Sequence, residues 1–334
     1  MFDIAGMLVL VVLILLFGFL ATRAWRVNNR LLKWIGVLVA GLLTIIPALI
    51  GVLAVNGYAK LNQRYDNPVP TPKATGSSAQ IARGQQLAHI CMSCHSTNNQ
   101  LPLAGTDFLN KFGLPPLGTL YSPNLTPGGN IDGWTDGELV RAIREGVSKD
   151  GRSLLIMPSS NLRNLSDEDV LALVAYLRSQ PPTGSPTPPT RFSLFGAVFT
   201  NLVDFRTAQP PAGTVIAPPP AVGATYGKYM VSILGCSDCH GPRLEGKVDT
   251  GEPGPPPGPN LTQIVPQWTE AQFMEFFNTG TRPDGSTVPI LTLPSGFTEP
   301  RMPWPEFRAA TTDDELRAMY AYLHSLPPID GPTQ

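Results

Sequence analysis

The feature that most constrains this 334-residue chain is a five-residue pattern, Cys-x-x-Cys-His, that occurs twice. The copies stand at Cys91–His95 and Cys236–His240, and together they use all four cysteines of the chain. Two thiols three positions apart can bond to the two vinyl groups of one porphyrin, and the histidine that follows then lies under the iron. The pattern predicts two covalently attached haem c groups, with thioether bonds at Cys91, Cys94, Cys236 and Cys239 and axial ligation by His95 and His240.

Three other chemistries use paired cysteines. A redox dithiol would leave the histidine after each pair unexplained. A structural zinc site built from both pairs would join ligands 145 residues apart, well outside the usual spacing of zinc fingers. Two disulfides would be compatible with an oxidising compartment but would not select this spacing. The repeated pattern favours haem over these three alternatives.

Two uncharged apolar runs precede the first motif. Ile4–Thr22 and Trp34–Ala59 are each long enough to cross a hydrocarbon core of about 30 Å as a helix, and Pro47 is tolerable within such a helix. The segment between them, Arg23–Lys33, carries four positive charges and is expected on the cytoplasmic side. Residues 1–59 are therefore predicted to form a two-helix transmembrane hairpin.

This topology places both termini and the haem motifs on the outer, periplasmic side of a bacterial cytoplasmic membrane. Haem c is attached on that same side, so two independent arguments agree. The alternative is a cleaved signal peptide followed by a single spanning helix. The first run lacks the basic leader and the small-residue cleavage site that a signal peptide carries.

The chain after the apolar runs contains a loose internal repeat. Gly84 and Gly227 each begin an apolar segment that leads into a haem motif. The other matching pairs, in chain order, are Pro123–Thr126 with Pro259–Thr262, Trp134–Thr135 with Trp268–Thr269, Asp150–Gly151 with Asp284–Gly285, and Met157–Pro158 with Met302–Pro303.

Each repeat is predicted to close with an amphipathic helix that begins at Ser166 or Thr312 and stops before a Pro-Pro pair. Glu315 stands three residues after Thr312 and completes a capping box, whereas Asp169 after Ser166 is a weaker version. The fold class expected from these patterns is all-α.

Each iron needs a second axial ligand opposite its histidine. His89 lies too close to Cys91 to reach the distal side, and His324 has an arginine, Arg178, at the matching position of the first repeat. Met157 and Met302 each precede a proline, which fixes the backbone after the methionine. Met157 and Met302 are therefore the predicted distal ligands, and thioether ligation raises the reduction potential.

These motifs resemble the class I cytochrome c superfamily. More narrowly, Gly118–Thr126, Trp134–Asp136, Arg144–Gly146 and Leu165–Asp169 resemble the cytochrome subunits of bacterial membrane-bound alcohol, gluconate and aldehyde dehydrogenases. The likeness covers residues 78–182 well and residues 223–328 less closely. It implies two tandem class I cytochrome c domains behind the hairpin. Members of that group usually carry three haem motifs and a C-terminal anchor, so their partners do not transfer directly.

The expected organisation is an anchor at 1–59, a stalk at 60–77, cytochrome c domains at 78–182 and 223–330, and a proline-rich linker at 183–222. Phe192–Phe205 is an apolar segment within this linker. It is suited to lie on the membrane, to dock a partner, or to pack between the two haem domains, and packing between the domains is the favoured interpretation.

The function expected is electron transfer in a respiratory or photosynthetic chain, without catalysis by this chain. Donors would be a quinol-oxidising complex or a dehydrogenase, and acceptors a soluble carrier, a reaction centre or an oxidase. The net charge of −1 gives no bias toward nucleic acid. The alternatives are a dihaem subunit of a dehydrogenase or haem-copper oxidase, and a dihaem enzyme such as a peroxidase or thiosulfate dehydrogenase.

Overall fold

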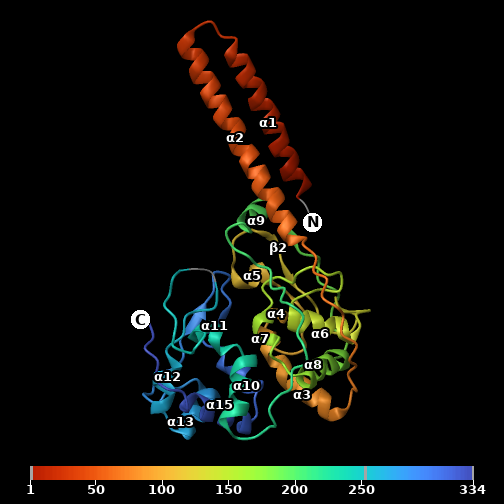
Figure 1. The fold of residues 1–334 in the computed structure, drawn as a ribbon, viewed down its shortest axis with the longest axis vertical. Helices are drawn as coiled ribbons and strands as arrows, with labels where there is room; N and C mark the ends of the chain where they lie inside the picture. Colours follow the sequence, from red (N-terminus) through yellow and green to blue (C-terminus); the bar gives the residue numbers. More distant parts are fainter. Residues whose placement is uncertain (1–2, 252–253, 333–334) are drawn as a thin grey trace.

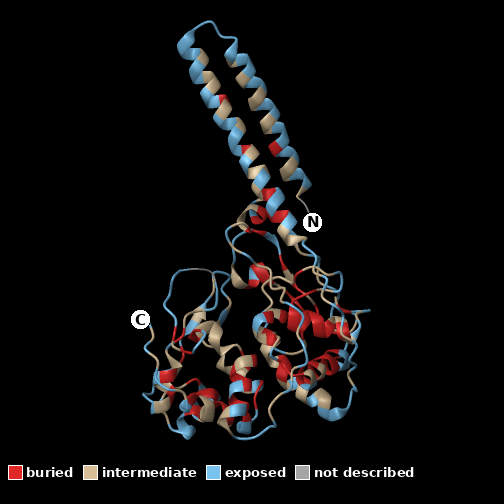
Figure 2. Ribbon diagram, in the orientation of Figure 1, coloured by how far each residue is buried: buried red, intermediate tan, exposed pale blue. Residues whose placement is uncertain are grey.

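The two apolar runs fold as long antiparallel helices, α1 (Ile4–Trp25) and α2 (Arg30–Leu61), that project from the rest of the molecule (Figure 1). The computed structural model describes residues 3–251 and 254–332. Both helices are long and apolar enough to cross a membrane, and most of their apolar side chains are exposed (Figure 2). At the hairpin turn, the Trp25 and Trp34 rings meet edge to face.

The rest of the chain forms a mainly helical head in which the buried residues are concentrated (Figure 2). The first set of helices packs as the first repeat, and its members are α3 (Ser78–Ala88), η1 (His89–Cys91), α4 (Met92–His95), α5 (Phe108–Phe112), α6 (Asp136–Glu145), α7 (Ser159–Leu162) and α8 (Asp167–Ser179). The second set repeats this order, and its members are α10 (Ala224–Ile233), α11 (Cys236–His240), α12 (Leu261–Ile264), η2 (Val265–Gln267), α13 (Glu270–Thr279), α14 (Trp304–Ala309) and α15 (Asp313–His324).

In each repeat the first and last helices cross closely at a glycine. A Cβ atom at Gly84 would lie 1.8 Å from the Ala172 carbonyl oxygen, and one at Gly227 would lie 1.8 Å from the Ala318 carbonyl oxygen. Only glycine allows α3 to approach α8, and α10 to approach α15, at this distance. These two crossings hold the ends of each repeat together around its haem motif.

The helix starts follow the capping residues in the sequence. Thr135 and Thr269 form capping boxes at α6 and α13, and Thr312 with Glu315 forms the predicted box at α15. Ser166 accepts a bond from the Asp169 backbone at α8, but no reciprocal bond completes the box there. The Asp169 carboxylate is used instead by Arg83 and Tyr229, which lie on other helices.

Among the residues that the structure describes, three two-stranded antiparallel sheets add small amounts of β structure to the expected all-α fold. The pairs join short loop segments, and they are β1 (Thr106–Asp107) with β3 (Tyr121–Ser122), β2 (Gly118–Thr119) with β4 (Arg191–Phe192), and β5 (Ile290–Thr292) with β6 (Thr298–Pro300).

Residues 192–207, which we call the collar, lie at the foot of the hairpin and contain α9 (Leu194–Phe199) (Figure 1). A small apolar core joins collar residues Phe192 and Ala197 to Ala54 and Tyr58 of α2 and to the first repeat. The prediction that this segment packs between the two repeats is therefore wrong. The sequence shows that the segment is apolar, but it does not show which of two apolar surfaces it covers.

The extended residues between α2 and α3 lie along the first repeat. The Asn67 amide donates to the Glu145 carboxylate at 2.6 Å, and the Pro70 carbonyl packs where a Cβ at Gly137 would stand. The Ala74 amide donates to Asp136 at 3.1 Å. The segment expected as a stalk, residues 60–77, is therefore not a free connection but packs along the length of α6.

The two repeats pack against each other through a buried polar network. Arg83 of α3 bonds to Asp169 at 2.8 Å and to Glu315 of the second repeat at 2.6 Å. Gln86 donates across the interface to Glu315, and Tyr229 donates in the opposite direction to Asp169. Asp169 and Glu315 hold the same position in their helices, so the two repeats meet through matching residues.

Candidate haem-binding sites

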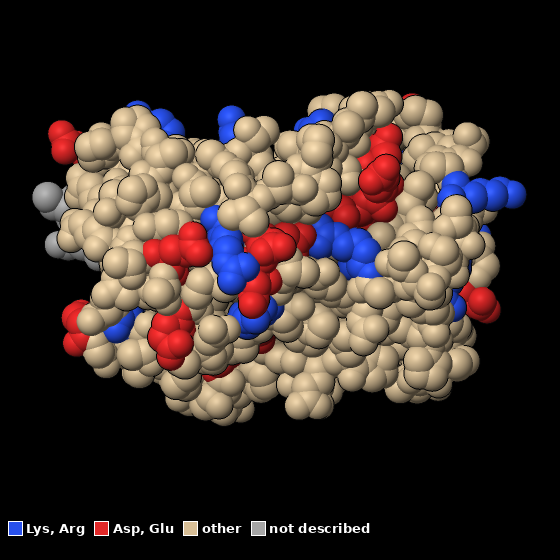
Figure 3. All heavy atoms as spheres, turned by 90° about the horizontal axis from the view of Figure 1, so that it is seen from below, with Lys and Arg blue, Asp and Glu red and all other residues tan. Residues whose placement is uncertain are grey.

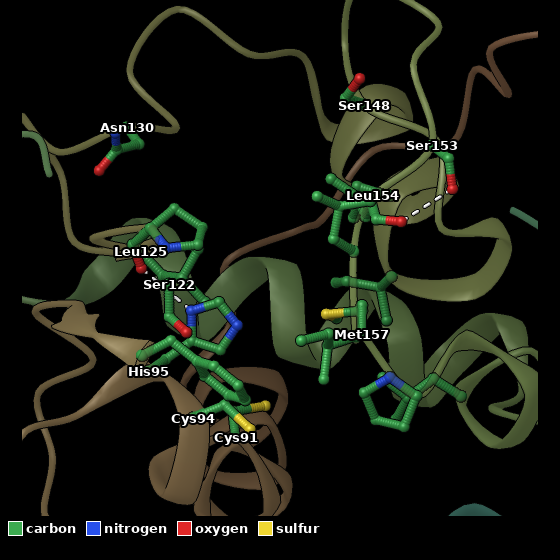
Figure 4. Close-up of a pocket in the computed structure, with 18 of the residues that line it drawn as sticks. Cys91, Cys94, His95, Ser122, Leu125, Asn130, Ser148, Ser153, Leu154 and Met157 are labelled. Carbon is green, nitrogen blue, oxygen red and sulfur yellow. Dashed lines mark hydrogen bonds between the residues drawn. The ribbon is translucent and has the colours of Figure 1, made fainter. Parts of the chain in front are cut away.

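The first Cys-x-x-Cys-His motif lies at one side of a largely apolar cavity of about 460 Å³. Cys91, Cys94 and His95 line it from η1 and α4, and Met157 lines it from the loop before α7. Figure 4 shows the His95 ring and the Met157 sulfur on opposite sides of the cavity, directed toward each other. The volume lies within the range of about 300–1,000 Å³ that is usual for cofactor sites.

Both motif histidines are oriented by a backbone carbonyl. Nδ1 of His95 lies 3.0 Å from the Pro123 oxygen, and Nδ1 of His240 lies 2.7 Å from the Pro259 oxygen. A proton on Nδ1 makes this hydrogen bond and leaves the Nε2 lone pair for a metal. Burial lowers the pKa of both rings below the usual value for imidazole, which favours the neutral form that binds iron.

The Pro-Asn-Leu-Thr segments explain why these carbonyls stand in place. Asn124 accepts bonds from the backbone and hydroxyl of Thr126, and Asn260 does the same with Thr262. The Asn124 amide also donates to the Thr183 carbonyl, just beyond α8. Each asparagine thus closes a tight Asx turn that positions the preceding proline. Comparing the two repeats in the sequence finds the Pro-Asn-Leu-Thr segment. Only the hydrogen bonds of its asparagine show that the segment positions the carbonyl group that orients the histidine.

Met157 and Met302 have the same local backbone. The proline after each has φ near −77° and ψ near 55°, with values of −77° and 53° at Pro158 and −76° and 58° at Pro303. The next amide donates to the methionine carbonyl at 2.7 Å in both repeats. A short helix, α7 or α14, begins directly afterwards. Both methionines are half-buried and pack against the main core.

The first methionine loop has an additional restraint. Ile156, immediately before Met157, adopts a left-handed φ of 62°, which is costly for a β-branched residue. Its amide donates to the Phe205 carbonyl of the collar at 2.9 Å, and the Thr207 amide donates to Leu154 at 3.0 Å. The collar therefore holds the Met157 loop in this conformation.

The thiols have a property that argues against a redox dithiol. Burial raises the pKa of Cys91 and Cys236 to about 12, the opposite of the shift that activates a reactive cysteine. All four cysteines are free of disulfide bonds. Within residues 3–251 and 254–332, no group of three or more His, Cys, Asp or Glu side chains is arranged to hold a metal ion.

The sequence pattern of cytochrome c matches this chain twice, at residues 81–181 and 224–327. The chain belongs to the cytochrome c family. The two matched segments each contain one Cys-x-x-Cys-His motif, so the cytochrome carries covalently bound haem c at both. The paired thiols, the carbonyl-oriented imidazoles and the apolar cavity of the first repeat all fit this cofactor.

Relatives of the cytochrome include subunits of bacterial dehydrogenases. It is 32% identical to a subunit of the nicotinate dehydrogenase of Pseudomonas putida over 77% of this chain and 22% of that protein. It is 26% identical to the fructose dehydrogenase cytochrome subunit of Gluconobacter japonicus over 80% of this chain and 57% of that relative. The cytochrome thus spans less than two thirds of the length of these relatives.

A relative of similar length is a dihaem c-type cytochrome of Cereibacter sphaeroides. The identity is 25%, over 76% of this chain and 88% of the relative. Together these likenesses confirm the predicted resemblance to dihaem cytochromes c and to the cytochrome subunits of dehydrogenases.

The second motif is built like the first. Cys236 and Cys239 are half-buried, and His240 is buried beneath Gly258, where a Cβ would meet the imidazole ring at 2.7 Å. Glycine is therefore required for the close approach of this loop to His240. Met302 lies in the loop before α14, in the place that Met157 occupies in the first repeat.

Two lysines that sequence reasoning missed bond to the haem-motif helices of the cytochrome. Lys111 of α5 is buried, and its Nζ donates to the Ser93 and Ser96 carbonyls, each at 2.6 Å. Lys247 is exposed and donates at 2.7 Å to the Asp238 carbonyl, which matches Ser93 in the second motif. The lysines stand at unmatched positions in the repeats, so no repeat pattern indicates them. Burial lowers the pKa of Lys111 from its usual value.

The two remaining histidines of the cytochrome have other contacts. His89 bonds through Nδ1 to the Gln86 carbonyl at 3.0 Å, within its own helical segment. His324 packs its ring against Tyr320 at a centroid distance of 5.2 Å. Neither lines the cavity that contains His95 and Met157.

The first haem cavity also touches the second repeat. Ile233, Leu234, Gly235 and Asp238, at and before the second motif, line part of its wall. In the other direction, α14 contacts η1 at the start of the first motif. The helix that follows each methionine, α7 or α14, therefore lies against the haem-motif region of the other repeat.

Proposed function

We propose that this chain is a membrane-anchored periplasmic dihaem cytochrome c that transfers electrons in a respiratory or photosynthetic chain. Its plan would be a transmembrane hairpin at 1–59, a connecting segment at 60–77, tandem class I domains at 78–182 and 223–330, and a linker at 183–222. The observation that carries the proposal is the placement of His95 and Met157 on opposite sides of one cavity that Cys91 and Cys94 also line.

In this proposal each haem c, when bound, supplies an iron that cycles between ferrous and ferric states. Cys91, Cys94, Cys236 and Cys239 hold the porphyrin covalently. His95 and His240 present Nε2 because Pro123 and Pro259 accept their Nδ1 protons. Met157 and Met302 present thioether sulfurs from loops that proline fixes. The apolar lining of the first cavity excludes water and favours the less charged ferrous state.

The proposed location of the protein in the inner membrane is inferred from the hairpin of α1 and α2. The two apolar helices and the four basic residues of the segment between them support an inner-membrane hairpin with the loop in the cytoplasm. The haem-bearing head would then lie in the periplasm. On the face remote from the hairpin, acidic and basic side chains are interleaved (Figure 3). Such a face does not form a large field of one sign for a strongly charged partner.

A second candidate function is that of a cytochrome subunit in a dehydrogenase complex. The observation that favours it is the likeness to subunits of nicotinate and fructose dehydrogenases. The dehydrogenase would be the electron donor, and a soluble carrier, reaction centre or oxidase would be the acceptor.

The test of both candidates begins with the full chain purified from membranes in mild detergent. We expect iron and covalent haem at two per chain, and one or none would contradict the dihaem proposal. Copurification of a catalytic dehydrogenase subunit would select the second candidate. Copurification of a copper-containing subunit would instead identify the partner as a haem-copper oxidase.

A further inference from the structure

The collar carries an apolar stripe, formed by Phe195, Val198, Phe199 and Leu202, whose two ends are exposed at the surface. Phe195, Val198 and Phe199 lie on α9, and Leu202 lies in the turn just after it. Val198 and Phe199 are partly buried against the small core, whereas the two end residues are exposed. Phe195 is 54% exposed and Leu202 is 81% exposed. The Phe199 ring stacks on Phe195 at a centroid distance of 6.0 Å. The opposite face, with Gly196 and Ala197, is buried.

The collar is fixed to the outer end of α2. A Cβ at Gly57 would lie 1.8 Å from the Ala197 carbonyl oxygen, so helix and collar are in direct backbone contact. The Asn201 amide donates to the Leu53 carbonyl at 2.9 Å, and the Asn56 amide donates to the Asn201 side chain at 2.7 Å.

The collar is also fixed to the start of α1. The Leu194 amide donates to the Asp3 carboxylate at 3.2 Å. The same carboxylate caps Gly6, and the Asp3 amide donates to the Tyr58 hydroxyl at 3.0 Å. The collar therefore binds both helices of the hairpin at one level.

That level is where the hydrocarbon core of a membrane would end. Trp25 and Trp34 meet at the hairpin turn and are typical of residues at a membrane interface. About 20 helical residues cross the hydrocarbon core, and counting from Trp34 reaches Leu53. Leu53, Asn56 and Gly57 are among the residues of α2 that contact the collar. The stripe thus lies at the level where the hairpin would leave the hydrocarbon core.

The polar residues beside the stripe are compatible with a lipid headgroup region. Asp204 and Arg206 form an ion pair at 2.7 Å, so they add no net charge. Leu114, Pro115 and Pro116, next to the strand that pairs with β4, extend the exposed apolar surface.

We propose that the collar is a second membrane contact, in which the Phe195–Leu202 stripe lies in the interfacial region of the outer leaflet. This inference rests on the proposed anchoring by the hairpin. The occupant is a lipid surface, because the stripe begins where the hairpin leaves the hydrocarbon core. The contact holds the first haem site at a fixed height, since the collar lines that cavity with Phe192 and restrains the Met157 loop through Phe205.

The experiment uses the full-length holoprotein in nanodiscs whose phospholipids carry a photoreactive diazirine in the acyl chain. Trypsin cleavage then gives three informative peptides, 34–60 from α2, 192–206 from the collar, and 309–317 from the α14–α15 region. We expect lipid adducts on peptides 34–60 and 192–206 and only background labelling on peptide 309–317. The double substitution Phe195→Ser and Leu202→Ser should reduce the collar adducts to that background.

The matched control is Ile216→Ser, which changes another exposed apolar residue of the linker, 85% exposed and next to the Val215 contact with α8. It should leave the adduct pattern unchanged. Covalent haem content confirms that each variant has folded.

Labelling of peptide 34–60 with only background on peptide 192–206 would overturn the collar contact while leaving the anchor intact. Failure to label peptide 34–60 would overturn the anchor and the inference with it. In native membranes, cross-linking of the collar to a protein without any lipid adduct would show that a protein partner covers the stripe, and the lipid proposal would be wrong.

Discussion

The side-chain amide of Asn161 donates a hydrogen bond of 2.5 Å to the carboxylate of Asp238, and this bond joins α7, the helix directly after Met157, to the second haem motif. Asp238 lies between the two cysteines of that motif, and it also lines the first haem cavity. One side-chain contact therefore links the Met157 side of the first cavity to the second Cys-x-x-Cys-His motif.

Asn161→Leu should weaken this junction. The substitution leaves the half-buried Asp238 carboxylate without its amide donor, which should lower the free energy of unfolding by about 1–2 kcal/mol. It should also slow electron transfer between the two haems, which can be measured after photochemical reduction of one of them. Ser160→Ala, at the exposed neighbouring position, is the control. An unchanged rate and stability in Asn161→Leu would show that the bond does not set the arrangement of the repeats.

Met157→Ala and Met302→Ala should each open one iron to external ligands. Carbon monoxide should then bind to one of the two ferrous haems, and the potential of that haem should fall because the thioether ligand is lost. Optical titration of the reduced protein measures both effects. Met92→Leu provides the control, since Met92 is buried in the core. A methionine variant that behaves like this control would not have lost a ligand.

Lys111→Gln should lower the reduction potential of the first haem. The buried ammonium group favours the ferrous state, and its removal should cost roughly 1 kcal/mol, equivalent to about 40 mV for one electron. Lys247→Gln removes a cation from the corresponding carbonyl of the second motif, but Lys247 is exposed and screened by solvent. A spectroelectrochemical titration should therefore show the larger shift for Lys111. Equal shifts in both variants would contradict a role for burial.

Arg83→Met should destabilise the junction of the repeats. It leaves the buried carboxylates of Asp169 and Glu315 without their shared cation, which should reduce the free energy of unfolding by about 3 kcal/mol. Denaturant unfolding in detergent measures the change. Arg317→Met, which breaks an exposed pair with Asp314, should cost less than about 1 kcal/mol. Comparable losses in the two variants would mean that the Arg83 network is no more important than a surface pair.

The sequence predicted correctly those features that depend on residues close together in the chain. The helix starts at Thr312 and Ser166 follow from a few neighbouring residues, and the structure confirms both. The paired Met-Pro segments likewise have the same backbone in both repeats because proline restricts each one in the same way. The two apolar runs form the expected long helices.

Contacts between distant segments could not be predicted in the same way. Lys111 reaches its carbonyl partners only because α5 folds beneath the first motif, and no spacing in the sequence encodes that approach. The collar was assigned to the wrong neighbour because an apolar stretch is compatible with any apolar surface. The left-handed conformation of Ile156 gives no sequence signal, since a β-branched residue normally avoids it.

The paired glycines also create a hazard during folding. Gly84 meets Ala172, and Gly227 meets Ala318, through the same backbone contact, so this contact alone does not distinguish α8 from α15 as the partner of α3. Chain connectivity discriminates only weakly between these closures, because the entropy of closing a loop grows slowly with its length. Arg83 beside Gly84 does not distinguish the two pairings either, because it bonds both to Asp169 of α8 and to Glu315 of α15. A chain that makes the exchanged pairing would become kinetically trapped, a risk that repeated architectures share.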